Sequence, residues 1–450
     1  MTVLKTFAEF SAATRLDQLS DAEREILKLH LLDTCAAAIA GSNTPIGQAL
    51  RELQAPGAGG VPVHAPGTIS DVSVRTGTVR HTEVDDIHTS SNVTPSSMIV
   101  PTALTMARQL GINDPQVFGG ALMAGYEAIL RLGMTIDGPV VMYKGIWPTF
   151  FCAAYGTAAV TARLLELSVE ATAEALAIAL TTSTGGAGRP GPRRPGRWLM
   201  VGEAARAGVA AALAAAAGFT AQLELLDGNW LAQPHGIDGK PEAMTEGLGG
   251  ASIVSELSMK PCCTGKQAAA ALSAFRDLLE EGLDAEAASA IEVFVPERYA
   301  AMIDRPAGPN VHVSSFGNIR YQFGLAAFHP ESLFDAARTT KVEDARLDAL
   351  MDKVVIKVDE ALETHMPRCW PARIEVTTPA GKFEKTVIAA PGDPDRRFGR
   401  EATVAKFHAI TDRLIGESEA DAWASAGLGA LADSAGLDRL IGRFEDLFGG

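Results

Sequence analysis

The sequence has few aromatic residues and no excess of positive charge. Phenylalanine, tryptophan and tyrosine make up 6% of its 450 residues, whereas hydrophobic residues make up 47%. Alanine and glycine are abundant, and such small side chains let helices pack closely. This composition therefore favours a large and mainly helical core. The formal net charge of −15 argues against a nucleic-acid binder, whose surface would be basic. A small anionic substrate stays compatible with this charge, since a single pocket can be basic in an acidic protein.

The sequence also lacks a disulfide framework and a targeting pattern. Its five cysteines are odd in number and form no CxxC pair, which predicts reduced thiols in a cytoplasmic protein. The first residues do not have the charged and then apolar pattern of a signal sequence. The apolar segment 203–218 contains Glu203 and Arg206, so we interpret it as a buried helix and expect no membrane partner.

Sequence motifs of common cofactor sites are missing as well. No GxGxxG follows a predicted strand, and neither a GxxxxGK[ST] nor a GxSxG motif occurs. The nine histidines do not have the spacing of metal ligands, so a metal site would need residues that are distant in the sequence. We therefore expect a protein that uses neither a metal nor an organic cofactor.

Helical patterns dominate the first part of the chain. Ser20 and Glu23 form a capping box that predicts a helix over 20–40, with Gly41 as its stop. Residues 42–80 are rich in glycine, proline and threonine, and we expect an irregular connection there. Further helices are predicted over 100–111, 115–134, 149–165, 169–182, 203–218 and 266–281.

The pattern changes after about residue 284. Strands are predicted over 290–296, 354–358, 373–378 and 383–388, with the last two as a hairpin, and a helix over 321–337. Helical segments return over 401–450. We therefore predict a mainly α protein, with a large all-helical domain (residues 1–258 plus 400–450) and an inserted smaller α+β lid domain (residues 259–399).

The segment 81–101 combines acids, histidines and hydroxyl groups just before a predicted helix. Such a loop can hold a carboxylate at the helix N-terminus, where free N–H groups point outward. The alternative is that Thr94 and Ser96 only cap the helix while Asp85 and Asp86 are solvated. The residues alone leave both possibilities open.

Two further segments offer groups for proton transfer. Tyr143 can donate or accept a proton if its pKa is lowered, unless Trp147 only packs and Lys144 is only a surface charge. Lys260 lies near Lys266 in the sequence, and a lysine near other cations can serve as a base.

Four arginines lie within nine residues of a chain that is otherwise acidic, namely Arg189, Arg193, Arg194 and Arg197. Prolines and glycines between them interrupt the helical pattern. Guanidinium groups bind carboxylates through two parallel hydrogen bonds, so this cluster favours an anion site. The alternative is a solvated basic loop, or a loop that pairs with acids of another subunit.

Together these segments resemble the MmgE/PrpD family over nearly the whole chain. Each motif is weak alone, and the resemblance depends on their order and spacing. The motifs are LDTC at 32–35, AGS at 40–42, DD at 85–86, TPS at 94–96, IVP at 99–101, AGYE at 124–127, RLG at 131–133, GIWPT at 145–149, GxAA at 202–205 and KPCC at 260–263.

The resemblance implies a homodimer with its site between a helical domain and a smaller α+β lid. Family members include 2-methylcitrate dehydratase, cis-aconitate decarboxylase and iminodisuccinate epimerase, which act beside a carboxylate of small polycarboxylates. Three positions depart from the family's pattern, because Thr94 and Trp147 replace histidines and Arg197 replaces a lysine. The dehydratase and the decarboxylase depend on those histidines for proton transfer, so we do not expect the same chemistry from the same groups.

We therefore expect a cofactor-independent epimerase that removes and returns a proton alpha to a carboxylate of a small di- or tricarboxylate. One alternative is a hydro-lyase or decarboxylase in which His88 replaces a missing histidine, and another is a carboxylate binder without turnover. The expected catalytic residues are Lys260, Tyr143, Asp86 and His88, with the first two as the proton-transfer pair. The expected substrate-binding residues are Thr94, Ser96, Lys144, Trp147, Arg193, Arg197 and Lys266.

Overall fold

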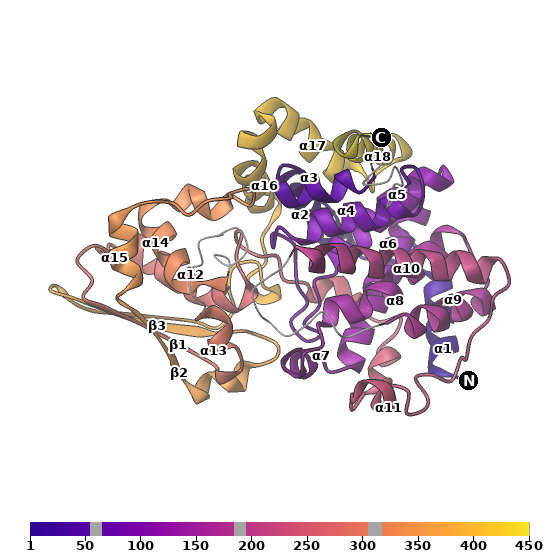
Figure 1. Cartoon of the computed structure of the whole chain (residues 1–450), viewed down its shortest axis with the longest axis horizontal. Helices are drawn as coiled ribbons and strands as arrows, with labels where there is room; N and C mark the ends of the chain where they lie inside the picture. The colour runs from indigo at the N-terminus through magenta and orange to yellow at the C-terminus, as the bar shows by residue number, and fades with distance from the viewer. Residues whose placement is uncertain (55–64, 184–194, 305–316, 450) are drawn as a thin grey trace.

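The computed structural model describes residues 1–54, 65–183, 195–304 and 317–449. Figure 1 shows a body made of helices next to a smaller part that contains the strands. The predicted fold class, mainly α with a small α+β part, is confirmed. We call the two parts the helical body and the α/β lobe.

The helical body contains the first eleven helices and the last three. They are α1 (Val3–Ala13), α2 (Asp21–Ser42), α3 (Pro45–Glu52), α4 (Ser70–Arg80), α5 (Ser96–Leu110), α6 (Pro115–Thr135), α7 (Gly138–Val141), α8 (Pro148–Leu164), α9 (Val169–Thr181), α10 (Gly196–Ala216), α11 (Ala232–His235), α16 (Arg400–Ile415), α17 (Glu417–Gly429) and α18 (Ser434–Phe448). The α/β lobe contains α12 (Lys266–Glu280), β1 (Ala290–Val295), α13 (Glu297–Ile303), α14 (Ile319–Phe328), α15 (Ala345–Met351), β2 (Val354–Val358), β3 (Ala372–Thr378) and β4 (Gly381–Val387).

Each part has its own apolar core. The core of the helical body combines side chains from residues 4–263 with side chains from residues 407–448, so that α16 and α17 pack on α2 and α18 packs on α5. The second core is built almost wholly from residues 262–390. The chain thus leaves the helical body, forms the α/β lobe and returns (Figure 1). The residue boundaries of the two domains stay a prediction.

The sheet of the α/β lobe has the strand order β2-β1-β3-β4. β1 is parallel to β2 and antiparallel to β3, and β3 is antiparallel to β4. Alternate residues of β1 and β3 are buried because one face of the sheet is covered, with α12 packed against β3 and β4. The predicted hairpin of the last two strands is confirmed. Its turn places Gly381 at a φ of 138°, which glycine adopts without steric cost.

Residues 42–80 differ from the irregular connection that their composition favours. They contain α3 and α4, and every residue of α4 after Ser70 is buried. The sequence of α4, SDVSVRTGTVR, has no apolar stripe because α2, α3, α5 and α10 cover it on several sides. Its central Arg75 is buried in an ion pair with Glu445 of α18.

Two helices have different bounds from those predicted. α5 begins at Ser96 rather than residue 100, and Pro101 lies inside it. α14 ends at Phe328, and a short 3-10 turn follows from Pro330 to Phe334, because a proline cannot continue the hydrogen bonding of an α-helix. Gly185 and Gly186, whose sequence indicates a helix stop after the predicted helix 169–182, lie outside the described residues.

α10 approaches its neighbours closely through two glycines. A Cβ atom on Gly202 would lie 2.1 Å from the backbone oxygen of Ser73 in α4, and one on Gly208 would lie 2.0 Å from that of Ala154 in α8. By length and composition α10 could cross a membrane, but the core helix of a soluble protein passes the same test. The close contacts at Gly202 and Gly208 fix the position of α10, which carries Arg197 in its first turn.

Candidate active site

A cavity lies where the helical body meets the α/β lobe. Its wall contains Arg80, Glu83, Thr94, Trp147 and Arg197 from the helical body, and Lys260, Gly265, Lys266, Gln267 and Met302 from the segment before α12, from α12 and from α13. The structure therefore brings together five of the residues that the sequence predicted for the site. They are Thr94, Trp147, Arg197, Lys260 and Lys266.

Four helices begin at this cavity. Thr94 lies two residues before the start of α5, Trp147 is the N-cap residue of α8, Arg197 is the second residue of α10, and Gly265 is the N-cap residue of α12. In none of these four helices does the side chain of the N-cap residue bond to the first turn. Because a helix N-terminus carries partial positive charge and free N–H groups, the starts of α8, α10 and α12 favour an anionic ligand, whereas at α5 the Asp86 carboxylate already accepts the N–H of Ser96.

Basic side chains add full positive charges to the wall. Arg80, Lys260 and Lys266 are each at least 96% buried, and Arg197 is half-buried. Among the described residues of the wall, Glu83 is the only carboxylate beside these four cations. Burying such side chains is costly unless they are paired, so their partners determine how the site works.

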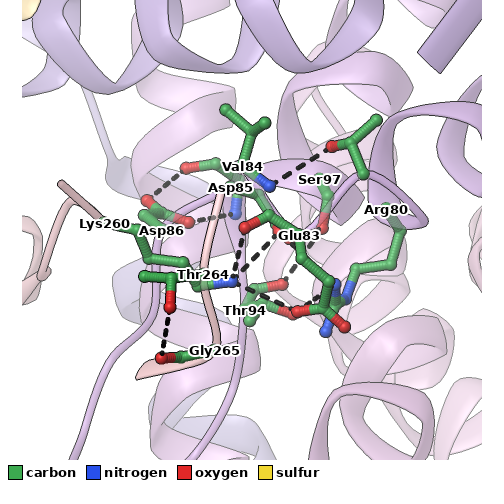
Figure 2. A network of polar contacts seen from close by, with 12 residues as sticks. Arg80, Glu83, Val84, Asp85, Asp86, Thr94, Ser97, Lys260, Thr264 and Gly265 are labelled. Atoms are coloured by element: carbon green, nitrogen blue, oxygen red, sulfur yellow. Dashed lines mark hydrogen bonds and ion pairs between the residues drawn. The ribbon is translucent and has the colours of Figure 1, made fainter. Parts of the chain in front are cut away.

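Lys260 is surrounded by oxygen atoms of the segment that follows α4 (Figure 2). Its Nζ lies 3.3 Å from Glu83 Oε2, 3.6 Å from Asp85 Oδ1 and 3.1 Å from the backbone oxygen of Glu83. Arg80 Nη1 lies 3.3 Å from each of the same two carboxylates. Burial raises the pKa of Asp85, although the charges of Arg80 and Lys260 oppose that rise. Lys260 and Glu83 thus form a buried ion pair in the wall itself.

Asp85 and Asp86 are buried rather than solvated, and they fix the start of α5. Ser97 Oγ donates a hydrogen bond to Asp85 at 2.7 Å. The backbone N–H and the hydroxyl of Ser96 donate to Asp86 at 3.1 Å and 2.5 Å. On the other side, His30 Nδ1 lies 2.8 Å from Asp86 Oδ2. Asp86 and Ser96 thus lie behind the wall, where they position the segment that carries Glu83 and Thr94.

Arg197 lies over the ring of Trp147, with Cζ 4.2 Å from the ring centroid. Such a cation–π contact stabilises a guanidinium group whose water has been removed. Thr94, on the same side of the cavity, is fixed by Thr149, whose hydroxyl accepts the Thr94 backbone N–H at 3.0 Å.

Lys266, in the first turn of α12, forms a buried ion pair with Asp393. Asp393 also accepts the backbone N–H of Ala390 at 2.8 Å, so its carboxylate is fixed to the segment that returns to the helical body. The wall therefore contains two buried lysines, each paired with a buried carboxylate.

The other predicted residues lie outside the wall. Tyr143 is 47% exposed, its hydroxyl lies 3.8 Å from Met302 Sδ, and partial burial raises its pKa to about 12. Lys144 is exposed. His88 is buried, and its ring nitrogens lie 2.9 Å from Ser91 Oγ and 3.1 Å from Glu256 Oε2. Arg193 lies outside the described residues.

The wall also contains residues that the sequence analysis did not single out. Arg80 is the last residue of α4, and Glu83 follows three residues later. Their opposite charges, next to the pair Asp85 and Asp86, are a sequence signal that indicates a polar site. Gln267 is adjacent to Lys266 and could have been included with it. Met302 of α13 is far from every other segment of the site in sequence, and nothing around it indicates a role.

Within the four described ranges, no group of three or more histidine, cysteine, aspartate or glutamate side chains is placed to hold a metal ion. The arginine and lysine side chains of the wall can bind anions.

Comparison with known families covers both parts of the chain. Residues 5–243 match the MmgE/PrpD N-terminal domain, and residues 261–427 match the MmgE/PrpD C-terminal domain. No curated protein matches the chain. Members of the family are generally enzymes, lyases or isomerases, and include dehydratases and epimerases. With both domains matched in order and the cavity at their junction, the chain belongs to the MmgE/PrpD family.

Proposed function

We propose that this protein is an isomerase that removes and returns a proton alpha to a carboxylate of a small di- or tricarboxylate. The observation that carries the proposal is the convergence of four basic side chains and of the N-termini of α8, α10 and α12 on one cavity. Carboxylates fit such a site because guanidinium, ammonium and backbone N–H groups all donate hydrogen bonds to them.

Epimerisation needs groups that reach one carbon from two sides. Lys260 with Glu83 is one group, since their charged atoms lie 3.3 Å apart in the wall. Lys266 with Asp393 is the second. In this proposal Lys266 replaces Tyr143 as the second proton-transfer residue, because Tyr143 lies outside the wall.

Loss of the alpha proton spreads negative charge onto the adjacent carboxylate. Arg80 and Arg197 lie in the wall with the starts of α8, α10 and α12, and groups that are already in place before the reaction stabilise such charge most effectively. In this proposal the helical body binds the carboxylates and stabilises the negative charge that forms on loss of the proton. The segment 260–267 supplies both lysines.

A hydro-lyase would remove the same proton and then protonate a leaving hydroxyl. The proposed substitute for that step, His88, is bonded to Ser91 and Glu256 away from the wall, so this alternative has less support. A binder without turnover has less support as well, because binding an anion does not require carboxylates beside the lysines.

The test is deuterium incorporation in heavy water, followed by mass spectrometry and NMR. The panel contains small di- and tricarboxylates and the stereoisomers of iminodisuccinate. We expect one deuterium at the alpha carbon of at least one compound, without loss of water or carbon dioxide. Lys260→Met should lower the rate by about 100-fold or more, the usual contribution of an acid–base group. Lys144→Met, a change at an exposed lysine, is the matched control.

Absence of deuterium from every compound would contradict the isomerase. Formation of an ultraviolet-absorbing enoate from a hydroxylated tricarboxylate would favour the hydro-lyase instead. Tyr143→Phe should keep most of the activity, and a loss as large as that of Lys260→Met would return Tyr143 to the proton-transfer pair.

A further inference from the structure

Two arginines and two tryptophans form one cluster at the cavity, which we call the Arg–Trp cluster: Arg80, Trp147, Arg197 and Trp198. Arg197 Cζ lies 4.2 Å from the ring centroid of Trp147 and 4.9 Å from that of Trp198. Arg80 Cζ lies 5.4 Å and 5.6 Å from the same two centroids. The two indole rings meet edge to face, 6.0 Å apart at 82°. Each guanidinium group is therefore shared between two rings.

These contacts restrict where the Arg197 side chain can lie. An arginine in solvent samples many rotamers, and ordering it for a ligand costs free energy. Trp147 is fixed as the N-cap residue of α8 and is only 6% exposed. Trp198 is buried behind it. The planar edge of a guanidinium group suits a two-point contact with a carboxylate.

Positive groups follow one another along the wall. Arg80 shares its two rings with Arg197, and its Nη1 lies 3.3 Å from Glu83, which in turn contacts Lys260. The Nε atom of Arg80 has no hydrogen-bond partner among the described residues, although it is buried. A ligand with two carboxylates can engage both the Arg197 end and the Lys260 end, whereas a monocarboxylate can engage only one.

We propose that Trp147 is a positioning residue that acts through Arg197, and that the Arg–Trp cluster binds one carboxylate of a dicarboxylate whose other carboxylate faces Lys260. This inference rests on the proposed function and narrows its substrate class. It also assigns a role to Trp147 that does not involve proton transfer.

The test measures binding of succinate and of propionate, its one-carboxylate counterpart, by calorimetry. The wild-type protein should bind succinate at least about tenfold more tightly than propionate, because a second ion contact is lost. Trp147→Leu should weaken succinate binding about tenfold, the usual size of a cation–π contact at a site without water. Trp147→Phe keeps an aromatic face and should stay within about threefold of the wild type.

A double-mutant cycle separates positioning from a direct contact or a general loss of structure. If Trp147 acts through Arg197, Trp147→Leu has no further effect once Arg197→Met has removed the guanidinium group. A tenfold loss in both backgrounds would overturn the inference, because Trp147 would then act independently of Arg197.

Trp230→Leu is the matched control, since Trp230 contacts Phe151 and His235 rather than the cavity wall. Should Trp147→Leu fail to fold, Trp147→Met takes its place, because methionine fills space without offering an aromatic face. If the wild-type protein bound neither probe, the proposed function would fail. Tight succinate binding that all Trp147 variants leave unchanged would overturn only this inference.

Discussion

At the residue scale, the structure determines the reactivity of the five cysteine thiols directly. All five are buried free thiols. Burial raises the pKa of Cys262 to about 11 and that of Cys35 and Cys263 to about 12. The thiolate is the reactive form, and its fraction falls tenfold for each pH unit below the pKa. We therefore expect slow labelling by Ellman's reagent in the native protein at pH 8 and a rate that rises with pH.

The control for this prediction is the unfolded protein, which should release five equivalents at once in denaturant. Cys369, which is 8% exposed, should react first in the native state. Fast labelling of Cys262 or Cys263 at pH 8 would contradict the burial of this pair beside Lys260.

Some single residues of the site could be predicted because their motif brings them to a helix start. Trp147 and Arg197 precede or begin α8 and α10, and both are in the wall. The buried pairing of Asp86 could not be predicted, because its partner His30 is distant in sequence. Tyr143 is close to Trp147 in sequence, yet it lies outside the wall, with its hydroxyl 3.8 Å from the Sδ atom of the wall residue Met302. Proximity in sequence does not fix the direction of a side chain.

At the scale of elements, α10 is the helix whose position matters most for the cavity. Gly202→Ala would place a methyl group 2.1 Å from the backbone oxygen of Ser73, so α4 and α10 would have to separate. We expect a loss of roughly 1–3 kcal/mol in the free energy of unfolding, measured by urea denaturation. Succinate binding should weaken too, because Arg197 moves with the helix.

Gly442→Ala is the matched control within the same chain. Gly442 lies in α18, and nothing lies within 4 Å of the position of an added Cβ atom. Because alanine favours the helix more than glycine does, this variant should gain about 0.5–1 kcal/mol. An unchanged stability of Gly202→Ala beside this gain would mean that α4 and α10 are less tightly packed than the structure indicates.

The elements with regular patterns were the ones that could be predicted. α6 and α8 carry long apolar patterns and were expected almost over their full lengths, as were the strands β3 and β4. α4 was missed because a helix enclosed by other helices needs no apolar stripe, and its buried serines, threonines and arginines resemble those of a loop. Its burial depends in part on α5 and α10, which come later in the chain.

At the scale of the whole molecule, the cavity should couple the two parts when it is filled. Succinate at 100 times its Kd is expected to raise the free energy of unfolding by about 2.7 kcal/mol. Because both parts contribute to the wall, hydrogen exchange should slow in β1 and β3 as well as in α10. Protection confined to the helical body would contradict a ligand that contacts Lys266.

A smaller part that contains the strands was predictable from the change in sequence pattern near residue 284, while the residue bounds of the two domains stay a prediction. Where the wall of the cavity lies was not predictable in the same way. It depends on how the segment 260–267 meets the ends of α4 and α8, which no local pattern records.

The insertion of the α/β lobe also affects how the protein is made. α2 is synthesised early, yet α16 and α17, which pack on it, are synthesised only after the whole lobe. At about 5–20 residues per second, the ribosome leaves the apolar face of α2 uncovered for tens of seconds. The lobe draws its core almost wholly from residues 262–390 and can fold as it emerges. We therefore expect that during synthesis a folded lobe lies beside a body in which the surface of α2 that contacts α16 and α17 stays exposed until those helices are made.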